Sequence, residues 1–296
     1  MSLRIAVTGA QGQVARALQD LHAEGVTLIA LARPDLDLAE PQTIAPALRA
    51  AAPNVVINAA AYTAVDKAES DKEAAFAVNE AGARAAAEAA AALDAPLIQL
   101  STDYVFDGRK RAPYVETDPP CPLNAYGASK LAGERAVAGA HPRHAIVRLS
   151  WVHAPYGANF VRTMLRLAET REEIAVVADQ IGRPMAAAHI AGALIAIARN
   201  LAGAPGARHF GMFHLGGDGQ ASWADFAEAI FAASAARGGP SARVRRITAA
   251  EYPTPAARPA FGVLDGARLE AAHGVRLPDW RIGLEASVAG ALQSGG

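Results

Sequence analysis

The sequence of 296 residues contains a single cysteine, Cys121, so it can form neither an intrachain disulfide nor a cluster of cysteine ligands. Aromatic residues make up only 6% of the chain, and the charges nearly balance, with a formal net charge of -1. Such a balance gives no long-range attraction to nucleic acid or to an anionic membrane. The longest apolar stretch, MAAAHIAGALIAIA, is shorter than the ~20 residues that span a bilayer, and it contains His189.

Apolar residues, in contrast, are abundant at 52%, which supports a large core and argues against disorder. The length favours two domains over one. The N-terminal MSLRIAVTGA passes directly into a strand-like segment without the pattern of a secretory leader. We therefore expect a cytoplasmic monomer or homodimer that binds neither nucleic acid nor a membrane.

The first half of the chain alternates short apolar runs with helical patterns. The predicted strands span 4–9, 26–32, 54–60, 95–101 and 144–150, and the predicted helices span about 12–20, 41–51, 70–93 and 125–139. Continuous apolar strands separated by helices are typical of a parallel sheet that is covered on both faces. The sequence thus predicts an α/β, doubly wound (Rossmann) sheet that binds ligands beyond the carboxyl ends of its strands.

The second half is less regular. We expect a helix at 158–169, a strand at 173–179, a helix near 187–201, a short strand in MFHLGG and a helix capped by Ser222. Trp223 and Phe226, which follow that cap, are interpreted as core. Pro253, Pro255 and Pro259 exclude a helix from the stretch EYPTPAARPAFGVLD.

A glycine-rich turn joins the first predicted strand to the first helix. VTGAQGQVARAL (7–18) places Gly9 and Gly12 there, so that the backbone can approach a pyrophosphate at a helix N-terminus. The spacing alone is a weak signal, and an ordinary tight turn is the alternative. Its position at the start of a βαβ unit favours a dinucleotide site.

The end of the second strand indicates which dinucleotide is bound. An acidic residue there typically binds the 2′-hydroxyl of NAD, whereas a basic residue suits the 2′-phosphate of NADP. The chain reads LARPDLDL, with Arg33 ahead of Asp35 and Asp37. Arg33 favours NADPH, with NADH possible, although an exposed loop arginine has the same appearance.

Three side chains form a candidate catalytic group. NAYGASKLAGE places Tyr126 and Lys130 on one face of a predicted helix. A nearby ammonium lowers the pKa of a tyrosine from about 10 toward the working range. Thr102, at the carboxyl end of a predicted strand, could bind a carbonyl oxygen while Tyr126 protonates it. The alternative is an exposed helix surface that carries Tyr and Lys by chance.

Several segments together resemble the dTDP-4-dehydrorhamnose reductases, a family within the extended short-chain dehydrogenase/reductase superfamily. The resemblance covers nearly the whole chain, in the family's order. The segments are VTGAQGQV, NAAAYTAVDKAES, STDYVFDG, PLNAYGASKLAGE, RLSWVH, NFVRTMLRLA, VVADQIGRP, SWADFAEAIF, YPTPAARPAFGVLD and LPDW.

The resemblance implies NAD(P)H-dependent reduction of the C4 ketone of dTDP-4-dehydro-L-rhamnose, with Tyr126 as the proton donor, Lys130 tuning it and holding the nicotinamide ribose, and Thr102 orienting the ketone. It implies that the cofactor contacts Gly9, Gln11, Gly12, Gln13, Val14, Arg33, Asp37, Leu38, Ala59, Ala61, Tyr62, Thr63, Tyr126 and Lys130. It implies that the sugar nucleotide contacts Thr63, Val65, Thr102, Asp103, Tyr104, Tyr126 and Trp151. Asn79 resembles a helix asparagine that shapes such sites, and Arg258 is a candidate contact of the diphosphate.

The resemblance also implies a division of the chain. Residues 1–150 would form the NAD(P)-binding domain, rejoined by segments near 173–215, and residues 151–296 would mainly form a smaller domain for the nucleotide sugar. No metal site is expected. Some relatives bridge a dimer with Mg²⁺ through glutamates, but one of these matches Ala17, which leaves Mg²⁺ doubtful. Pro142 within HPRH (141–144) argues against a metal-binding histidine pair.

Three other functions are compatible with parts of this pattern. A nucleotide-sugar dehydratase carries an Asp-Glu pair after the threonine, whereas this chain has Asp103 and Tyr104, so dehydration is disfavoured. A 4-epimerase uses the same three residues, and only the family-specific segments argue against it. A non-catalytic NADP-binding regulatory subunit, such as that of methionine adenosyltransferase, also resembles these reductases, but the intact group of Thr102, Tyr126 and Lys130 favours catalysis.

Overall fold

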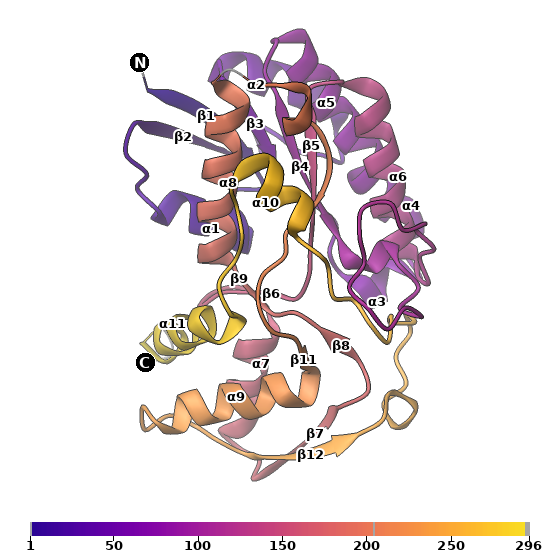
Figure 1. Cartoon of the computed structure of the whole chain (residues 1–296), viewed down its shortest axis with the longest axis vertical. Coiled ribbons are helices and arrows are strands. Elements are labelled where there is room, and N and C mark those ends of the chain that lie inside the picture. The colour runs from indigo at the N-terminus through magenta and orange to yellow at the C-terminus, as the bar shows by residue number, and fades with distance from the viewer. Residues whose placement is uncertain (1, 204, 294–296) are drawn as a thin grey trace.

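A six-stranded parallel sheet forms the centre of the fold in the computed structural model, which describes residues 2–203 and 205–293 (Figure 1). The spatial order of the strands is β10-β5-β4-β3-β1-β2. Their bounds are β1 Leu3–Thr8, β2 Val26–Leu31, β3 Val55–Asn58, β4 Leu97–Thr102, β5 His144–Leu149 and β10 Gly211–His214. The predicted parallel, doubly wound sheet is confirmed. Strands β3, β4 and β5 lie at its centre, which explains their continuous apolar runs.

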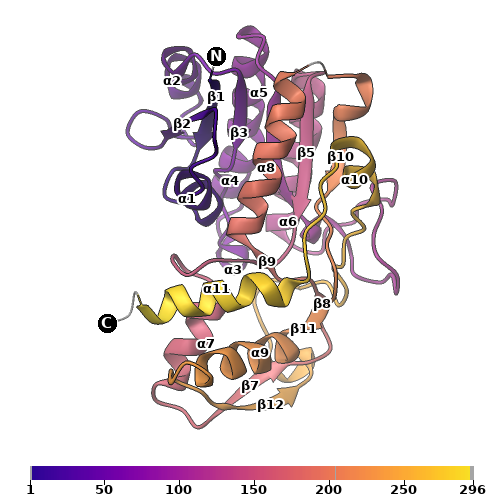
Figure 2. The same ribbon diagram turned by 60° about the vertical axis from the view of Figure 1, so that its left-hand side comes forward.

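Helices cover both faces of the sheet. On one face lie α1 (Gln13–Asp20), α8 (Ala187–Ala202) and α10 (Ala267–His273), whose buried residues share one core with the strands (Figure 2). On the other face lie α2 (Ile44–Ala51), α5 (Ala83–Ala92) and α6 (Ala125–Ala140), which share a second core. Helix α8 and strand β10 come from the second half of the chain, so the sheet is completed only after the polypeptide has left it and returned.

One predicted helix is interrupted. The pattern over 70–93 predicts a continuous helix, but the structure has α4 (Lys72–Phe76), then a π-helical turn at Ala77–Gly82, then α5. In such a turn each backbone hydrogen bond spans five residues instead of four. Single turns of this kind are frequent at functional sites. Three other short helical segments lie between the strands: a 3-10 turn at Pro41–Thr43, α3 at Val65–Ala68 and a 3-10 turn at Asp103–Val105.

A second, smaller unit packs below the carboxyl ends of the strands (Figures 1 and 2). Its core joins α7 (Phe160–Ala168), α9 (Trp223–Ala235) and α11 (Trp280–Gln293). Three small pairs of strands complete it: β6 (Val152–His153) with β9 (Met185–Ala186), β7 (Glu173–Val177) with β12 (Arg243–Ile247), and β8 (Ile181–Gly182) with β11 (Ala221–Ser222). A 3-10 turn lies at Ala249–Glu251, whereas the 3-10 turn at Ala207–His209 precedes β10 and belongs to the main sheet. The sequence predicted α7, β7 and α9 but not the other elements of this unit.

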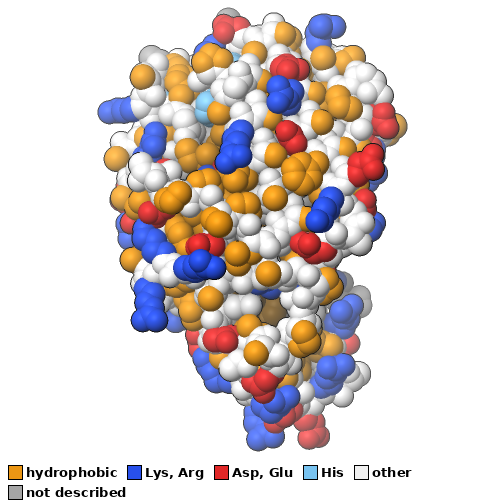
Figure 3. All heavy atoms as spheres, turned by 90° about the vertical axis from the view of Figure 1, so that its right-hand side faces the viewer, with side chains coloured by type: hydrophobic (Ala, Val, Ile, Leu, Met, Phe, Trp, Pro, Cys, Tyr) orange, Lys and Arg blue, Asp and Glu red, His pale blue; other side chains and the backbone are white. Residues whose placement is uncertain are grey.

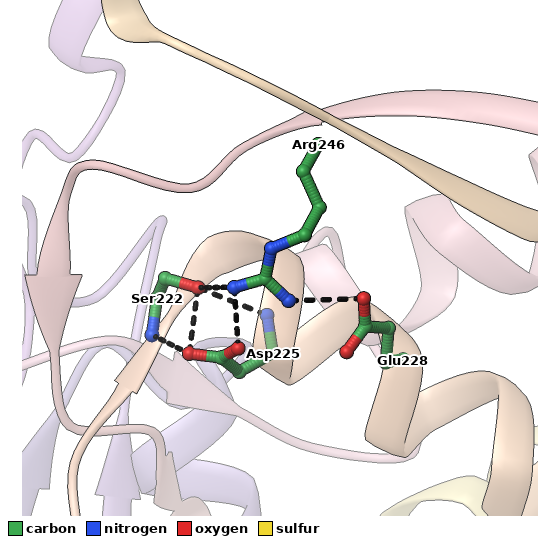
Figure 4. Close-up of polar contacts among 4 residues, drawn as sticks. All are labelled: Ser222, Asp225, Glu228 and Arg246. Atoms are coloured by element: carbon green, nitrogen blue, oxygen red, sulfur yellow. Dashed lines mark hydrogen bonds and ion pairs between the residues drawn. The ribbon is translucent and has the colours of Figure 1, made fainter.

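The start of α9 is fixed by a network of polar groups (Figure 4). Ser222 and Asp225 form a capping box, as the predicted cap requires: the Ser222 Oγ accepts from the Asp225 backbone N–H at 3.0 Å, and the Ser222 N–H donates to Asp225 Oδ2 at 2.8 Å. Arg246 on β12 donates to Asp225 Oδ1 at 2.6 Å and to Glu228 Oε1 at 3.0 Å. This network fixes the first turn of α9, which begins at Trp223.

The surface reflects the balanced composition. On the face shown in Figure 3, acidic and basic side chains are interspersed among hydrophobic ones without a large area of one sign. Within the described residues, no helix combines the length and the apolar character that crossing a membrane requires.

Candidate active site

A large cleft of about 1350 Å³ opens at the carboxyl ends of the central strands, between the sheet and the second unit. This is where a doubly wound sheet binds its ligands. The cleft brings together every residue that the sequence predicts for the cofactor or the substrate. They are Gly9, Gln11, Gly12, Gln13, Val14, Arg33, Asp37, Leu38, Ala59, Ala61, Tyr62, Thr63, Val65, Thr102, Asp103, Tyr104, Tyr126, Lys130 and Trp151.

The loop between β1 and α1 has the form that a phosphate site needs. Gly9 has a φ of +73°, and a Cβ there would lie 2.8 Å from the Cα of Ala60. The buried Thr8 donates to Asn58 Oδ1 at 2.5 Å and accepts from the Ala60 N–H at 3.1 Å, which ties this loop to the end of β3. Only glycine therefore allows the loop to pack this closely on the chain that follows β3, just before the N-terminus of α1.

Arg33 lies exposed beyond the end of β2. Its side chain is 79% exposed, and its Nε lies 3.8 Å from Asp37 Oδ2. Asp37 Oδ1 accepts from the backbone N–H of Ala39 at 2.9 Å. An arginine held only by a long, exposed ion pair remains available to an anionic ligand in the cleft.

Thr102 ends β4 and faces Tyr126 and Lys130 on α6. Its Oγ1 donates to Asp103 Oδ1 at 3.1 Å and accepts from the Tyr104 N–H at 3.2 Å. Asn124 caps α6 by accepting from the Gly127 N–H at 2.7 Å, which orients the first turn of the helix. The Tyr104 ring meets the Tyr126 ring edge-on, with centroids 5.8 Å apart.

The ionisation of Tyr126 differs from the sequence-based expectation. Burial raises its pKa to about 12, and a hydrogen bond with Thr102 opposes this only in part. We expected Lys130 to lower the pKa of this phenol, but no such effect of Lys130 is present. The Lys130 ammonium instead donates to the backbone carbonyl of Leu100 at 2.7 Å. Burial lowers the pKa of Lys130 to about 8, while the nearby Glu134 carboxylate acts to raise it.

A buried ion pair lies directly behind these residues. Arg148 on β5 donates from Nε to Glu134 Oε1 at 2.8 Å and from Nη2 to Oε2 at 2.7 Å. The hydroxyl of Ser101 on β4 also donates to Glu134 Oε1, at 2.5 Å. Because Glu134 lies one turn after Lys130 on α6, the pair joins this helix to both strands.

Asp103 is buried with an incompletely satisfied carboxyl group. Its Oδ2 has no hydrogen-bond partner among the described residues and faces the Cα of Gly262, where a side chain would collide with it. Burial raises the pKa of Asp103 to about 7, although the hydrogen bond from Thr102 lowers it. The group therefore titrates near neutral pH beside Thr102.

Asn79, within the π-helical turn, links three parts of the site. Its side-chain oxygen accepts from the Tyr62 N–H at 2.9 Å, and its Nδ2 donates to the Tyr62 carbonyl at 3.0 Å and to Ser129 Oγ at 2.9 Å. Ser129 lies between Tyr126 and Lys130 on α6. Asn79 thus holds the cofactor-side loop against the helix that carries Tyr126.

The second unit also lines the cleft, with residues that the sequence predicted, assigned to the core or left without a role. Trp223, predicted as core, packs against the core of the second unit but is only partly buried, because it also lines the cleft and stacks on Trp151 with ring centroids 3.5 Å apart. Phe226 is fully buried, as predicted. Arg258 lines the cleft and donates to Asp66 Oδ2 at 2.7 Å. Asn159 also lines it, and its place just before the helix of NFVRTMLRLA was a helix-cap signal that the sequence analysis did not use.

The histidines of HPRH bind backbone carbonyls. His141 Nε2 lies 3.0 Å from the Ala95 carbonyl oxygen, and His144 Nδ1 lies 2.6 Å from that of His141. In the part of the chain that the structure describes, no three His, Cys, Asp or Glu side chains come together in a way that could hold a metal ion.

Comparison with known proteins assigns the chain to a family. The family model described as RmlD substrate binding domain matches residues 3–292. A dTDP-4-dehydrorhamnose reductase of Sinorhizobium fredii is 51% identical over 278 residues, which cover 94% of each chain. The chain belongs to the dTDP-4-dehydrorhamnose reductase family. It is accordingly an oxidoreductase of the nicotinamide-dependent type.

Solved structures of the dTDP-4-dehydrorhamnose reductase family share the fold over almost the entire chain. The enzyme of Clostridium acetobutylicum is 36% identical with a TM-score of 0.89, covering 98% of this chain and 99% of that one. The enzyme of Bacillus anthracis, solved in complex with NADP, is also 36% identical with a TM-score of 0.89, covering 96% and 98%.

Proposed function

We propose that the protein reduces the C4 ketone of dTDP-4-dehydro-L-rhamnose to dTDP-L-rhamnose, with Tyr126 as the proton donor, Lys130 as the cation beside it and Thr102 as the group that orients the ketone. One observation carries this proposal: these three residues lie on the wall of the same cleft as the glycine-rich loop at the start of α1. The reductase names of the relatives support the substrate.

The cleft fits a nicotinamide dinucleotide. Gly9 and Gly12 line the cleft beside the N-terminus of α1, which suits a diphosphate. Gly12, Gln13 and Val14 would hold this diphosphate, and Arg33 and Asp37 would meet the adenosine ribose. The NADP complex of the Bacillus anthracis relative supports NADPH as the preferred form. When bound, the nicotinamide supplies the hydride.

The side chains of the site supply the proton and the orientation. With its pKa raised to about 12, Tyr126 carries its proton at neutral pH and can give it to the ketone oxygen as the C4–H bond forms. Lys130, which is charged below its pKa of about 8, would hold the nicotinamide ribose from its place one turn after Tyr126 on α6. Thr102 has one hydroxyl hydrogen, for which Asp103 and Tyr126 compete, and it must turn that hydrogen to the ketone oxygen.

We further propose a division of labour between the two parts of the chain. Residues 1–150, with α8 and β10, would bind the dinucleotide, and the remaining segments would enclose the nucleotide sugar. Trp151, Trp223 and Arg258 line the cleft from beyond residue 150, which supports this division.

The direct test is oxidation of NADPH after addition of dTDP-4-dehydro-L-rhamnose. Turnover is expected in the wild type, with kcat lowered by about 10²- to 10⁴-fold in Tyr126→Phe and Lys130→Met. Thr102→Val should lose about 10- to 10³-fold, because it removes one hydrogen bond to the developing oxyanion. Near-normal turnover by Tyr126→Phe would overturn the mechanism. No turnover by a folded wild type that binds NADPH would favour a non-catalytic binding protein.

Cofactor preference has its own test. We expect a higher kcat/KM with NADPH than with NADH, and we expect Arg33→Ala to lower the value for NADPH more than that for NADH. A clear preference of the wild type for NADH would contradict the role given to Arg33.

A further inference from the structure

The segment that enters α7 packs directly on the phosphate loop, although the two are far apart in the sequence. Asn159, the N-cap of α7, donates from Nδ2 to Gln13 Oε1 at 2.8 Å. The Tyr156 hydroxyl donates to the Gln13 carbonyl at 3.4 Å, and its ring lies 3.9 Å from the guanidinium of Arg16. Gly157 approaches so closely that a Cβ there would lie 3.3 Å from Gln13 Cγ. The second unit thus holds the first turn of α1.

The orientation of the Asn159 amide follows from its partners. Its Oδ1 accepts from the Arg162 backbone N–H at 3.1 Å, as a helix cap does. Its Nδ2 lies 2.9 Å from the Ala154 carbonyl and 3.0 Å from that of Tyr156, and a carbonyl can only accept. The oxygen and the nitrogen of the Asn159 amide can therefore be told apart, because each faces a backbone group that can only donate or only accept.

This assignment fixes the Gln13 amide in turn. A nitrogen of Gln13 at this place would bring two donors together, so the atom that faces the Asn159 Nδ2 is Oε1, which shares the two N–H bonds of Asn159 with the carbonyls of Ala154 and Tyr156. The two N–H bonds of the Gln13 Nε2 then point elsewhere, and no side-chain or backbone acceptor for them is present in the described chain. Because Gln13 lines the cleft at the N-terminus of α1, these donors are available to an anion bound there.

We propose that Asn159 is a positioning residue for cofactor binding: it holds the Gln13 amide with its N–H groups toward the dinucleotide diphosphate. The proposal rests on the proposed function in one respect, namely that the diphosphate lies beside α1. It places a determinant of cofactor affinity on the second unit, outside the glycine-rich loop itself.

The test is a double-mutant cycle on the dissociation constant of NADPH, measured by isothermal titration calorimetry without substrate. Gln13→Met removes the amide at similar length and should raise Kd about 10- to 100-fold, as expected for one hydrogen bond to a charged group. Asn159→Ser keeps a side-chain cap for α7 but frees the Gln13 amide. It should raise Kd about 3- to 10-fold, because only a fraction of the Gln13 conformers is then competent to bind.

The double variant separates positioning from a general effect on structure. If Asn159 acts through Gln13, Asn159→Ser should change Kd by less than about twofold in the Gln13→Met background. Gln13→Glu provides a further arm, because it keeps an acceptor for Asn159 but turns a carboxylate oxygen toward the diphosphate. It should weaken NADPH binding more than Gln13→Met does. Thermal unfolding of each variant reports whether the fold is retained.

Three outcomes would overturn the proposal: an equal effect of Asn159→Ser in both backgrounds, wild-type affinity in Gln13→Met, or wild-type affinity in Gln13→Glu. Turnover of dTDP-4-dehydro-L-rhamnose by the wild type is measured alongside. Tight NADPH binding without turnover would defeat the proposed function and leave the role of Asn159 standing. Turnover by the wild type, together with an equal effect of Asn159→Ser on Kd in both backgrounds, would support the proposed function and overturn the role of Asn159.

Discussion

Ionisable side chains are concentrated at buried positions around the Thr102 end of β4. Lys130, Asp103, Glu134 and Arg148 are each at most 5% exposed. Charge is costly in such a place unless it is paired, and the structure pairs Glu134 with Arg148, whereas Asp103 Oδ2 has no partner within residues 2–203 and 205–293. Substitution of any one of these residues should therefore change the pH dependence of activity or the free energy of unfolding.

Lys130 should give the reaction an alkaline limit. Its pKa is lowered by burial to about 8, so its charge is present below that pH and lost above it. We expect kcat/KM to fall as the pH rises through about 8, which lies below the usual lysine pKa of about 10.4. The profile of Lys130→Arg, whose side chain stays charged, should lack this limb. A wild-type profile that stays flat to pH 9.5 would contradict the assignment.

Asp103 should destabilise the fold at neutral and alkaline pH. Its folded-state pKa is raised from 3.8 to about 7, so stability is full below about pH 4 and declines as the pH rises through about 7. At ~1.36 kcal/mol per pH unit between the two pKa values, the loss approaches ~4 kcal/mol. Asp103→Asn should therefore gain stability relative to wild type at pH 8.5 but not at pH 4, as measured by urea unfolding. An equal difference at both pH values would argue against this account.

The buried ion pair behaves differently, because its two charges compensate each other. Glu134→Gln leaves Arg148 charged and buried without its partner, which typically costs ~3–5 kcal/mol. Replacing both residues, as in Glu134→Gln with Arg148→Met, should recover much of this free energy of unfolding. If the double variant is as unstable as the single one, packing and not charge dominates at this position.

At the scale of elements, two glycines in α6 allow this helix to pack closely on the neighbouring segments. A Cβ at Gly133 would collide with the Asn79 carbonyl in the π-helical turn, and one at Gly127 would collide with the Tyr104 carbonyl. These contacts hold the helix that carries Tyr126 and Lys130 against the segments that carry Tyr62 and Thr102. Small shifts of α6 would therefore alter the geometry of all three catalytic candidates at once.

Two glycine substitutions in α6 should have opposite effects. Gly133→Ala pushes the helix away from Asn79 and should cost about 1–3 kcal/mol of stability together with a loss of kcat. Gly139→Ala, on the same helix with no atoms within 4 Å of its added Cβ, should gain about 0.5–1 kcal/mol. Thermal unfolding and turnover of the two variants side by side check both signs. A stabilising Gly133→Ala would contradict the described packing.

The length of a helix or strand decided whether the sequence could predict it. The five strands of the first half and the helices α6, α7 and α8 were predicted because each has a long apolar or helical pattern. Strands β6, β8, β9 and β11 have two residues each, which is too short to produce any period. The π-helical turn keeps helical composition, so only its hydrogen bonds reveal it. Trp223 was interpreted as core because an aromatic residue after a helix cap has the same pattern whether it faces a core or a cleft.

At the scale of the whole molecule, the PTPAARP segment fastens the second unit to the first across the cleft. Arg258 forms its ion pair with Asp66 on α3, and the Ala256 N–H donates to the other oxygen of that carboxylate at 3.2 Å. Asn124, the cap of α6, donates to the Ala257 carbonyl at 2.7 Å. Contacts so distant in sequence cannot be predicted from local patterns, and they hold the Arg258 cation at the wall of the cleft.

Arg258 should therefore govern the affinity for the nucleotide sugar. Arg258→Gln should raise the KM for dTDP-4-dehydro-L-rhamnose by about 10-fold or more, with little change in the Kd of NADPH. Asp66→Asn is the matched variant, because it weakens the same fastening but keeps the cation, and it should raise KM less. Equal effects of the two variants would indicate that Arg258 only anchors the loop.

The parallel pairing of β10 with β5 has a consequence for synthesis of the chain on the ribosome. Strand β5 is made long before residues 211–214, and until these emerge its outer edge has no strand to pair with. An unpaired edge of a largely completed sheet invites association with other chains. Nascent chains that stall between β5 and β10 should therefore depend on chaperones more than chains that have passed residue 214.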